Sequence, residues 1–167
     1  MYRWRVSLGK RLVSLVLWCV IAFIPGVIGG VASIQARSFY MELARPEWAP
    51  PGWVFGPVWS TLYLMMGLSA WLVWLRVGLT QGRVALGVFF AQLVLNALWS
   101  WLFFAWRLGG AAFADIVLLW GLILGTVILF WRIRPLAGAL LLPYLGWVSF
   151  AAALNWATWR MNPGLLG

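Results

Sequence analysis

The sequence predicts an all-α integral membrane protein, a bundle of five transmembrane helices with one structured loop between the first and the second. Of its 167 residues, 65% are hydrophobic, 17% aromatic and only 9% charged. A soluble domain of this length needs more charge to cover its surface. Apolar runs of about 20 residues, enough to cross a bilayer as a helix, recur along the chain. The alternating pattern of a membrane β-barrel is absent.

The predicted spans are separated by short polar or glycine-containing breaks. The spans cover about 12–34, 54–75, 84–105, 111–131 and 136–158. The breaks are Arg76–Arg83, Arg107–Gly110 and Arg132–Pro135. Only residues 35–53 form a connection long enough to be a structured loop. We therefore expect one domain over residues 1–167, without linker or internal repeat.

The basic residues predict an orientation. An odd number of spans places the termini on opposite sides of the membrane. Eight Lys and Arg lie on the amino-terminal side, namely Arg3, Arg5, Lys10, Arg11, Arg76, Arg83, Arg132 and Arg134. Four lie on the other side, namely Arg37, Arg45, Arg107 and Arg160. The positive-inside rule then predicts a cytoplasmic amino terminus and an outer long loop. A cleaved signal peptide in place of the first span is the alternative.

The residue types that are scarce exclude several classes of protein. The chain has no histidine, one cysteine and three carboxylates, so a conventional zinc, di-iron or Ser-His-Asp site cannot be built and no metal is expected. Cys19 lies in an apolar run and is expected to pack there. The net charge of +9 is spread between apolar runs, which indicates membrane topology and no nucleic-acid partner.

Polar residues fall at helical spacing on two of the predicted spans. Gln92, Asn96 and Ser100 form a stripe on the third span, and Trp147, Ala151 and Asn155 form one on the fifth, with Leu154 beside them. Trp59 and Tyr63 share a face of the second span. By helical rise, Trp59 lies roughly 8 Å and Asn96 and Trp147 roughly 14–17 Å below the long-loop side. These polar residues either line a site or join neighbouring helices by hydrogen bonds worth about 1 kcal/mol each.

The tryptophans divide into two groups. Most of the 15 lie near span ends, where an interfacial aromatic belt is expected. Trp59, Trp99 and Trp147 lie within spans and near the polar stripes, which is typical of an aromatic-walled site for a small molecule. The spacings Gly26-x-x-x-Gly30 and Gly121-x-x-x-Gly125 permit close helix contact, within one bundle or between two copies. Pro143 is expected to bend the fifth span.

Three motifs carry a resemblance to a known family. The stretches "RPEWAPPGWVFGPVWSTLYLMMG", "QLVLNALWSWLFF" and "LLPYLGWVSFAAALN" resemble the translocator protein family, also called tryptophan-rich sensory proteins or peripheral-type benzodiazepine receptors. The resemblance implies five membrane helices, commonly dimeric, with a ligand cavity beneath the first long loop. Its ligands would be porphyrins such as protoporphyrin IX and haem, sterols in some members, and benzodiazepine-type compounds, with no cofactor required.

The resemblance also implies site residues. The lid would be formed by Tyr40, Trp48 and Pro50. The pocket would be lined by Trp59, Asn96, Ser100, Trp147, Ala151 and Leu154. Trp99 is added to this set because it lies within a span near a polar stripe, as Trp59 and Trp147 do. The sequence departs from the family's sterol-recognition pattern, because Trp156 stands where that pattern needs a tyrosine. Motifs of this kind also predict sterol binding only weakly. Porphyrin therefore ranks above sterol. Arg37 or Arg45 would meet the propionates.

Three functions follow from this resemblance. A receptor that senses tetrapyrrole or stress status ranks first. A light-dependent porphyrin-degrading enzyme ranks second, with Trp59 and Trp147 matching the tryptophans assigned to that chemistry. A transporter of porphyrin or sterol ranks third, since five spans lack the inverted halves of many carriers. Asp115 is expected to cap the fourth span or to pair with Arg107 rather than to carry protons.

Overall fold

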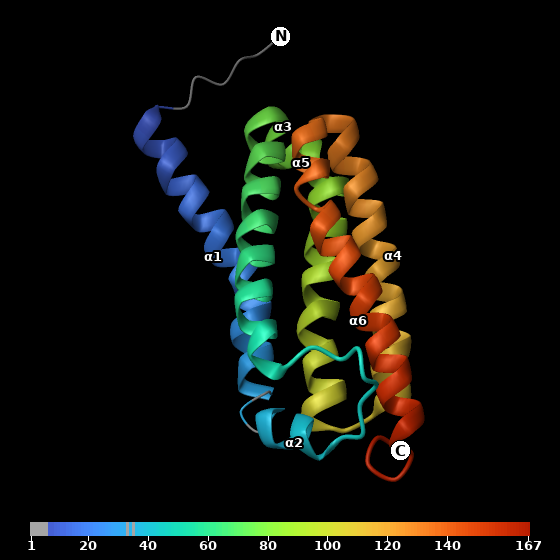
Figure 1. The fold of residues 1–167 in the computed structure, drawn as a ribbon. Coiled ribbons are helices and arrows are strands. Elements are labelled where there is room, and N and C mark those ends of the chain that lie inside the picture. The colour runs from blue at the N-terminus through green and yellow to red at the C-terminus, as the bar shows by residue number, and fades with distance from the viewer. Residues whose placement is uncertain (1–6, 33, 35) are drawn as a thin grey trace.

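The computed structural model describes residues 7–167 except 33 and 35, and this part of the chain is helical. The helices and helical turns are α1 (Leu8–Ala32), α2 (Ala36–Glu42), η1 (Gly52–Val54), α3 (Phe55–Ser100), η2 (Trp101–Ala105), α4 (Gly109–Ile133), α5 (Pro135–Ala139) and α6 (Leu142–Met161). Figure 1 shows the long helices side by side, with α2 and the following loop across one end of the bundle. Arg3 and Arg5, which contribute to the predicted orientation, lie outside the described residues.

Helix α3 consists of two antiparallel arms, a first arm over residues 55–77 and a second arm over residues 79–100. Gly78 has φ 67° and ψ −174°, a backbone region that essentially only glycine occupies because a Cβ would clash with the chain. The chain reverses there, and the two arms run back along each other (Figure 1). A hydrogen bond of 2.7 Å from the Tyr63 hydroxyl to Asn96 Oδ1 joins them. The break predicted over Arg76–Arg83 is wrong in extent, because one glycine makes the turn inside an otherwise helical stretch.

Two other boundaries differ from the sequence prediction. The predicted fifth span is divided into α5 and α6 by a turn at Leu140–Leu141. Pro143 lies in the first turn of α6, where its missing N–H costs nothing and its ring is incompatible with a preceding helical turn. The predicted loop over 35–53 contains α2 and η1. It is a structured connection, as expected, and part of it is helical.

The core lies between the two arms of α3, α4 and α6. Met66, Phe89, Ile123, Phe130 and Tyr144 are among its fully buried side chains. Helix α1 packs against the first arm of α3 at a point of close backbone approach. A Cβ built on Gly67 would lie 2.7 Å from the Cα of Cys19. Cys19 is therefore a packing residue, as expected.

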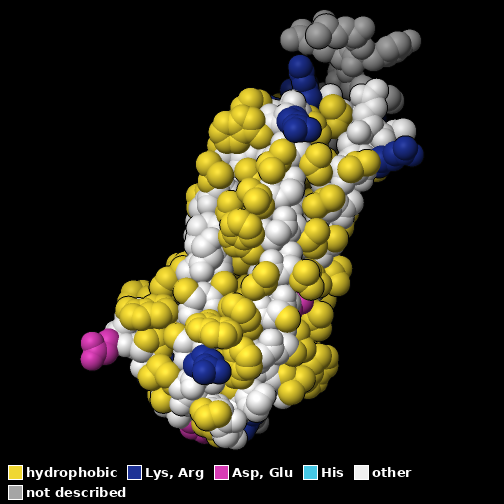
Figure 2. All heavy atoms as spheres, turned by 90° about the vertical axis from the view of Figure 1, so that its right-hand side faces the viewer, with side chains coloured by type: hydrophobic (Ala, Val, Ile, Leu, Met, Phe, Trp, Pro, Cys, Tyr) yellow, Lys and Arg dark blue, Asp and Glu magenta, His cyan; other side chains and the backbone are white. Residues whose placement is uncertain are grey.

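The outer surface of the bundle is apolar. Leu8, Val13, Val27, Val94 and Leu118 are each at least 60% exposed, and Figure 2 shows hydrophobic side chains over the middle of one face with most of its Lys and Arg near the upper end. Four described helical stretches are long and apolar enough to cross a membrane: Leu8–Ala32, Gly52–Ala105, Gly109–Ile133 and Pro135–Met161. The protein is therefore a multi-pass integral membrane protein. Gly52–Ala105 has 54 residues, about twice the length of the others, because it holds both arms.

Candidate ligand-binding site

A buried network of polar side chains joins three helical segments. The Tyr63 hydroxyl donates to Asn96 Oδ1 at 2.7 Å, and Asn96 Nδ2 donates to the Tyr144 oxygen at 3.1 Å. The Tyr144 hydroxyl in turn donates to Gln92 Oε1 at 2.8 Å. These residues come from both arms of α3 and from α6, and each is at most 7% exposed. The network fixes the spacing of the three segments because each hydroxyl or amide has its partner in another segment.

A second polar link lies closer to the loop end of the bundle. Trp99 Nε1 donates to Asn155 Oδ1 at 2.9 Å, and Asn155 Nδ2 donates to the Gly109 carbonyl at 3.2 Å. This link ties the second arm of α3 to α6 and to the first residue of α4. Gln92, Asn96 and Asn155 thus all bond across helices. The interpretation of the polar stripes as helix-joining groups is supported for these three residues.

A small cavity lies between these two links. It has a volume of about 10 Å³ and is lined by Trp59, Asn96, Trp99, Ile116, Leu119, Val148 and Ala151. Trp59 stacks on Tyr63 with ring centroids 5.4 Å apart and meets Tyr144 edge-on at 6.1 Å. Pockets for drug-sized ligands are about 300–1,000 Å³. A large planar ligand can therefore enter only if the helices or the covering loop move apart.

A chain of aromatic rings closes the bundle above this cavity. Trp48 meets Phe150 edge-on at 5.7 Å, Phe150 contacts Trp147 at 5.4 Å, and Trp147 meets Phe55 at 5.9 Å. Phe55 then meets Tyr40 at 5.6 Å. The Tyr40 hydroxyl donates to the Pro50 carbonyl at 3.0 Å, which brings the chain back to the loop that carries Trp48. We call these five aromatic residues together with Pro50 the aromatic roof.

One polar atom of the roof is left without a partner. Trp147 Nε1 is buried and donates no hydrogen bond. An indole N–H enclosed among aromatic rings usually finds an acceptor, because leaving it unpaired costs about 1–3 kcal/mol. In the described structure it is a donor available to a ligand's carbonyl or carboxylate oxygen.

The residues predicted for the site divide between the aromatic roof and the cavity, and two of them lie outside both. Tyr40, Trp48, Pro50 and Trp147 belong to the roof, and Trp59, Asn96, Trp99 and Ala151 line the cavity. Leu154 is buried but is not among the residues that line the cavity. Ser100 is turned toward α1, since a Cβ on Gly29 would lie 2.7 Å from its Oγ.

Sequence reasoning missed three aromatic residues of the site and three aliphatic residues that line the cavity, Ile116, Leu119 and Val148. Phe55 and Phe150 complete the roof, and Tyr144 is the centre of the polar network. Tyr144 could have been found, because it precedes Trp147 by three residues and Ala151 by seven, on one helical face. No sequence signal points to Phe55 or Phe150.

Cationic side chains also lie at the roof end. The Arg45 guanidinium lies 4.5 Å from the centroid of the Tyr40 ring, and that of Arg107 lies 4.6 Å from the Phe39 ring. Cation–π contacts of this kind are worth about 0.5–1 kcal/mol at exposed sites. Arg45 is thus held at the edge of the roof. The side chain of Arg37 lies outside the described part of the structure.

Asp115 contradicts both roles predicted for it. No side-chain hydrogen bond caps α4, and the Arg107 guanidinium lies over Phe39 instead. Asp115 is 6% exposed, in the second turn of α4, and its Oδ2 has no hydrogen-bond partner. The prediction failed because Asp115 is too far into the helix to reach the first-turn amides.

The unpaired oxygen of Asp115 gives a stability prediction. We expect Asp115→Leu to raise the free energy of unfolding by about 1–3 kcal/mol, because it removes a buried carboxyl whose Oδ2 has no hydrogen-bond partner. Asp115→Asn, which keeps a polar group of the same shape, should change it less. Equilibrium unfolding in detergent measures both. A loss of stability in both variants would contradict the prediction.

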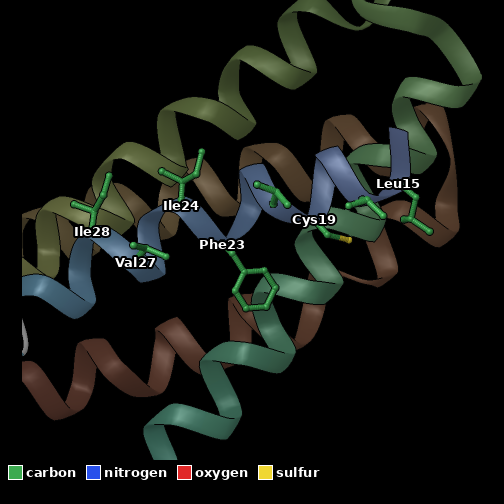
Figure 3. A pocket seen from close by; sticks show the side chains of 8 residues that line it. Leu15, Cys19, Phe23, Ile24, Val27 and Ile28 are labelled. Atoms are coloured by element: carbon green, nitrogen blue, oxygen red, sulfur yellow. The ribbon is translucent and has the colours of Figure 1, made fainter. Parts of the chain in front are cut away.

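A larger hollow lies elsewhere, on the outer side of α1. This groove has a volume of about 570 Å³ and is lined by α1 side chains alone, including Leu15, Cys19, Phe23, Ile24 and Ile28 (Figure 3). None of its lining side chains can form a strong hydrogen bond. An apolar groove on the outside of a membrane helix faces lipid, so it gives no recognition of a polar ligand group.

The fold and the roofed cavity together define a class: a multi-pass helical membrane protein with an aromatic site at one end. The TspO/MBR family profile matches residues 14–160. The chain is 42% identical to the translocator protein of Homo sapiens over 135 residues, 80% of each chain. It is 39% identical to the tryptophan-rich protein TspO of Chlorobaculum tepidum over 159 residues, covering 93% of this chain and all of that one.

A third relative, the tryptophan-rich sensory protein of Cereibacter sphaeroides, is 35% identical over 132 residues, 78% of this chain and 81% of that one. The chain belongs to the TspO/MBR family. The resemblance seen in the three sequence motifs is thereby confirmed.

Proposed function

We propose that this protein is a membrane receptor that binds tetrapyrroles, protoporphyrin IX and haem, between the aromatic roof and the cavity, and reports tetrapyrrole or stress status. The observation that carries the proposal is the closed roof above a cavity walled by Trp59 and Trp99. A porphyrin is a flat apolar disc with two carboxylates. Aromatic faces suit the disc, each pair contributing about 0.5–1.5 kcal/mol beyond burial.

The proposal assigns roles to the polar groups at the roof. Trp147 Nε1, which has no partner, would donate to an oxygen of the ligand. Arg45, at the edge of the roof, would meet a propionate. Tyr40, Trp48 and Pro50 would open as a unit, because the Tyr40–Pro50 hydrogen bond joins them. Ser100 and Leu154 stay predicted contacts for a ligand larger than the present cavity.

The membrane arrangement belongs to the same proposal. Each arm of α3 is about 33 Å long by helical rise, enough to cross the hydrocarbon core, so the protein would cross the membrane five times. The amino terminus would be cytoplasmic and the roof outside. A homodimer is expected. Gly121 of α4 is free to contact a second copy of the protein, since a Cβ there would meet no atom within 4 Å.

A dark titration tests the binding proposal. Tryptophan fluorescence of the detergent-purified protein should be quenched saturably by protoporphyrin IX, and Trp147→Ala should weaken the binding. Haem should bind about as well, because the chain has no histidine, the commonest axial ligand. Non-saturable quenching, or quenching that the variant leaves unchanged, would contradict the proposal. Binding that depends on iron would contradict the second expectation.

A second function, light-dependent degradation of bound porphyrin, is favoured by two ring contacts of Trp59. Trp59 stacks on Tyr63 and meets Tyr144 edge-on, so an oxidised indole would have two oxidisable phenols beside it. Illumination of the bound complex should then bleach the porphyrin, and Trp59→Phe or Trp147→Phe should stop the bleaching. Bleaching at the same rate in both variants would leave the receptor as the function.

A further inference from the structure

The segment that follows α6 bonds to the loop that follows α2. Asn162 Oδ1 accepts a hydrogen bond from the Ala44 N–H at 2.9 Å, and Asn162 Nδ2 donates to the Ala44 carbonyl at 2.8 Å. The same Nδ2 donates to the Thr158 carbonyl at 2.7 Å. One side-chain amide thus occupies both backbone groups of Ala44, as a neighbouring strand would. Asn162 itself is 7% exposed.

The segment is in turn anchored to the bundle. Leu166 is completely buried in a cluster with Phe39, Leu43, Phe103 and Ala112. Its carbonyl accepts a hydrogen bond of 2.9 Å from the Gly109 N–H at the start of α4. Figure 1 shows the carboxy terminus at the same end of the bundle as α2 and the loop. Asn162 therefore connects the loop to a fixed point.

Few other hydrogen bonds fix the path of the loop. Over residues 43–51 the backbone supplies those from Leu43 to Phe39, from Ala49 to Pro46 and from Val54 to Pro51, and the Tyr40 hydroxyl donates to the Pro50 carbonyl. Three of these residues, Pro46, Pro50 and Pro51, have no backbone N–H to donate. The loop carries Trp48 and Pro50, so its position sets whether the aromatic roof is closed.

We infer that Asn162 is a latch for the roof: its two hydrogen bonds to Ala44 hold the loop closed, and their release lets a ligand pass. The side-chain hydrogen bonds of Asn162 go to Ala44 and Thr158 and not to residues that line the cavity, so Asn162 acts through the loop. The role in ligand passage rests on the proposed function, whereas the closure of the loop does not.

Hydrogen–deuterium exchange of the whole protein in detergent tests the latch without any ligand. In Asn162→Ala, the amides of residues 43–49 should exchange faster, on the order of tenfold, while α4 and α6 stay as protected as before. Asn162→Asp has the same shape but sets a second acceptor against two carbonyls, so it should loosen the loop at least as much. Met161→Ala, a neighbouring side chain that is 47% exposed, is the matched control and should change nothing.

Two results would overturn the inference. One is an unchanged exchange rate over residues 43–49, and the other is an equal rise in the helices, which would make Asn162 a general stability residue. With protoporphyrin IX as probe, dissociation measured by stopped flow should accelerate together with the exchange rate. Faster exchange with unchanged dissociation would show that the loop does not gate the site. Absence of binding to the unaltered protein would refute the proposed function and leave the exchange result to decide on the latch.

Discussion

Ala151→Leu is expected to lower the affinity for protoporphyrin IX at least about tenfold. Ala151 lines the cavity, which is only about 10 Å³ in the closed state, and its side chain is 8% exposed. An isobutyl group there would occupy the space between Trp59 and Trp99 that a planar ligand must enter. Overpacking of this kind also costs about 1–3 kcal/mol of stability. Fluorescence quenching in the dark measures the affinity.

Ala153→Leu is the matched control for this experiment. Ala153 lies two residues further along α6 and is exposed, so the same change of volume there enlarges only the outer surface. Its affinity should equal that of the unaltered protein. A thermal unfolding curve for each variant separates blocked binding from lost folding. If a folded Ala151→Leu variant bound protoporphyrin IX with the same affinity as the unaltered protein, the ligand would have to lie elsewhere in the protein.

The positions of the long helices could be predicted because the bilayer imposes a length. The apolar runs predicted as spans are helical, the second and third as the two arms of α3 and the fifth as α5 and α6, with ends that differ by a few residues. The reversal at Gly78 could not be predicted in detail. Gly82 lies in the same break and is helical, and nothing in the local sequence distinguishes the two glycines. The choice depends on how the two arms of α3 pack.

The site was predicted in part for a similar reason. Helical phase places Asn96 and Ala151 on inward faces, and both line the cavity. Phase also placed Ser100 there, but a stripe of two turns drifts around the helix, and Ser100 ends against α1. The roof depends on where the loop crosses the bundle. Asn162 bonds to that loop and Leu166 packs against its first residue, Leu43, and both lie far along the chain, where no spacing rule connects them to Trp48.

Asn96→Leu is expected to lower the free energy of unfolding by about 3 kcal/mol. The change removes the acceptor of the Tyr63 hydroxyl and the donor to Tyr144. Interhelical hydrogen bonds in membranes contribute about 0.6 kcal/mol on average, up to about 1.7. Burying the freed Tyr63 hydroxyl adds about 1–3 kcal/mol, because that side chain is only 7% exposed and water cannot replace the amide.

A double-mutant cycle with Tyr63→Phe separates these two costs. Tyr63→Phe alone should cost about 1 kcal/mol, since it removes one hydrogen bond and keeps the ring that stacks on Trp59. In the double variant no hydroxyl is left unpaired, so the total cost should fall below that of Asn96→Leu alone, by the penalty of about 1–3 kcal/mol that burying the freed hydroxyl adds. Equilibrium unfolding in detergent gives all three values. Costs that add to within about 0.5 kcal/mol would show that Asn96 and Tyr63 act independently and that the network does not hold the three segments together.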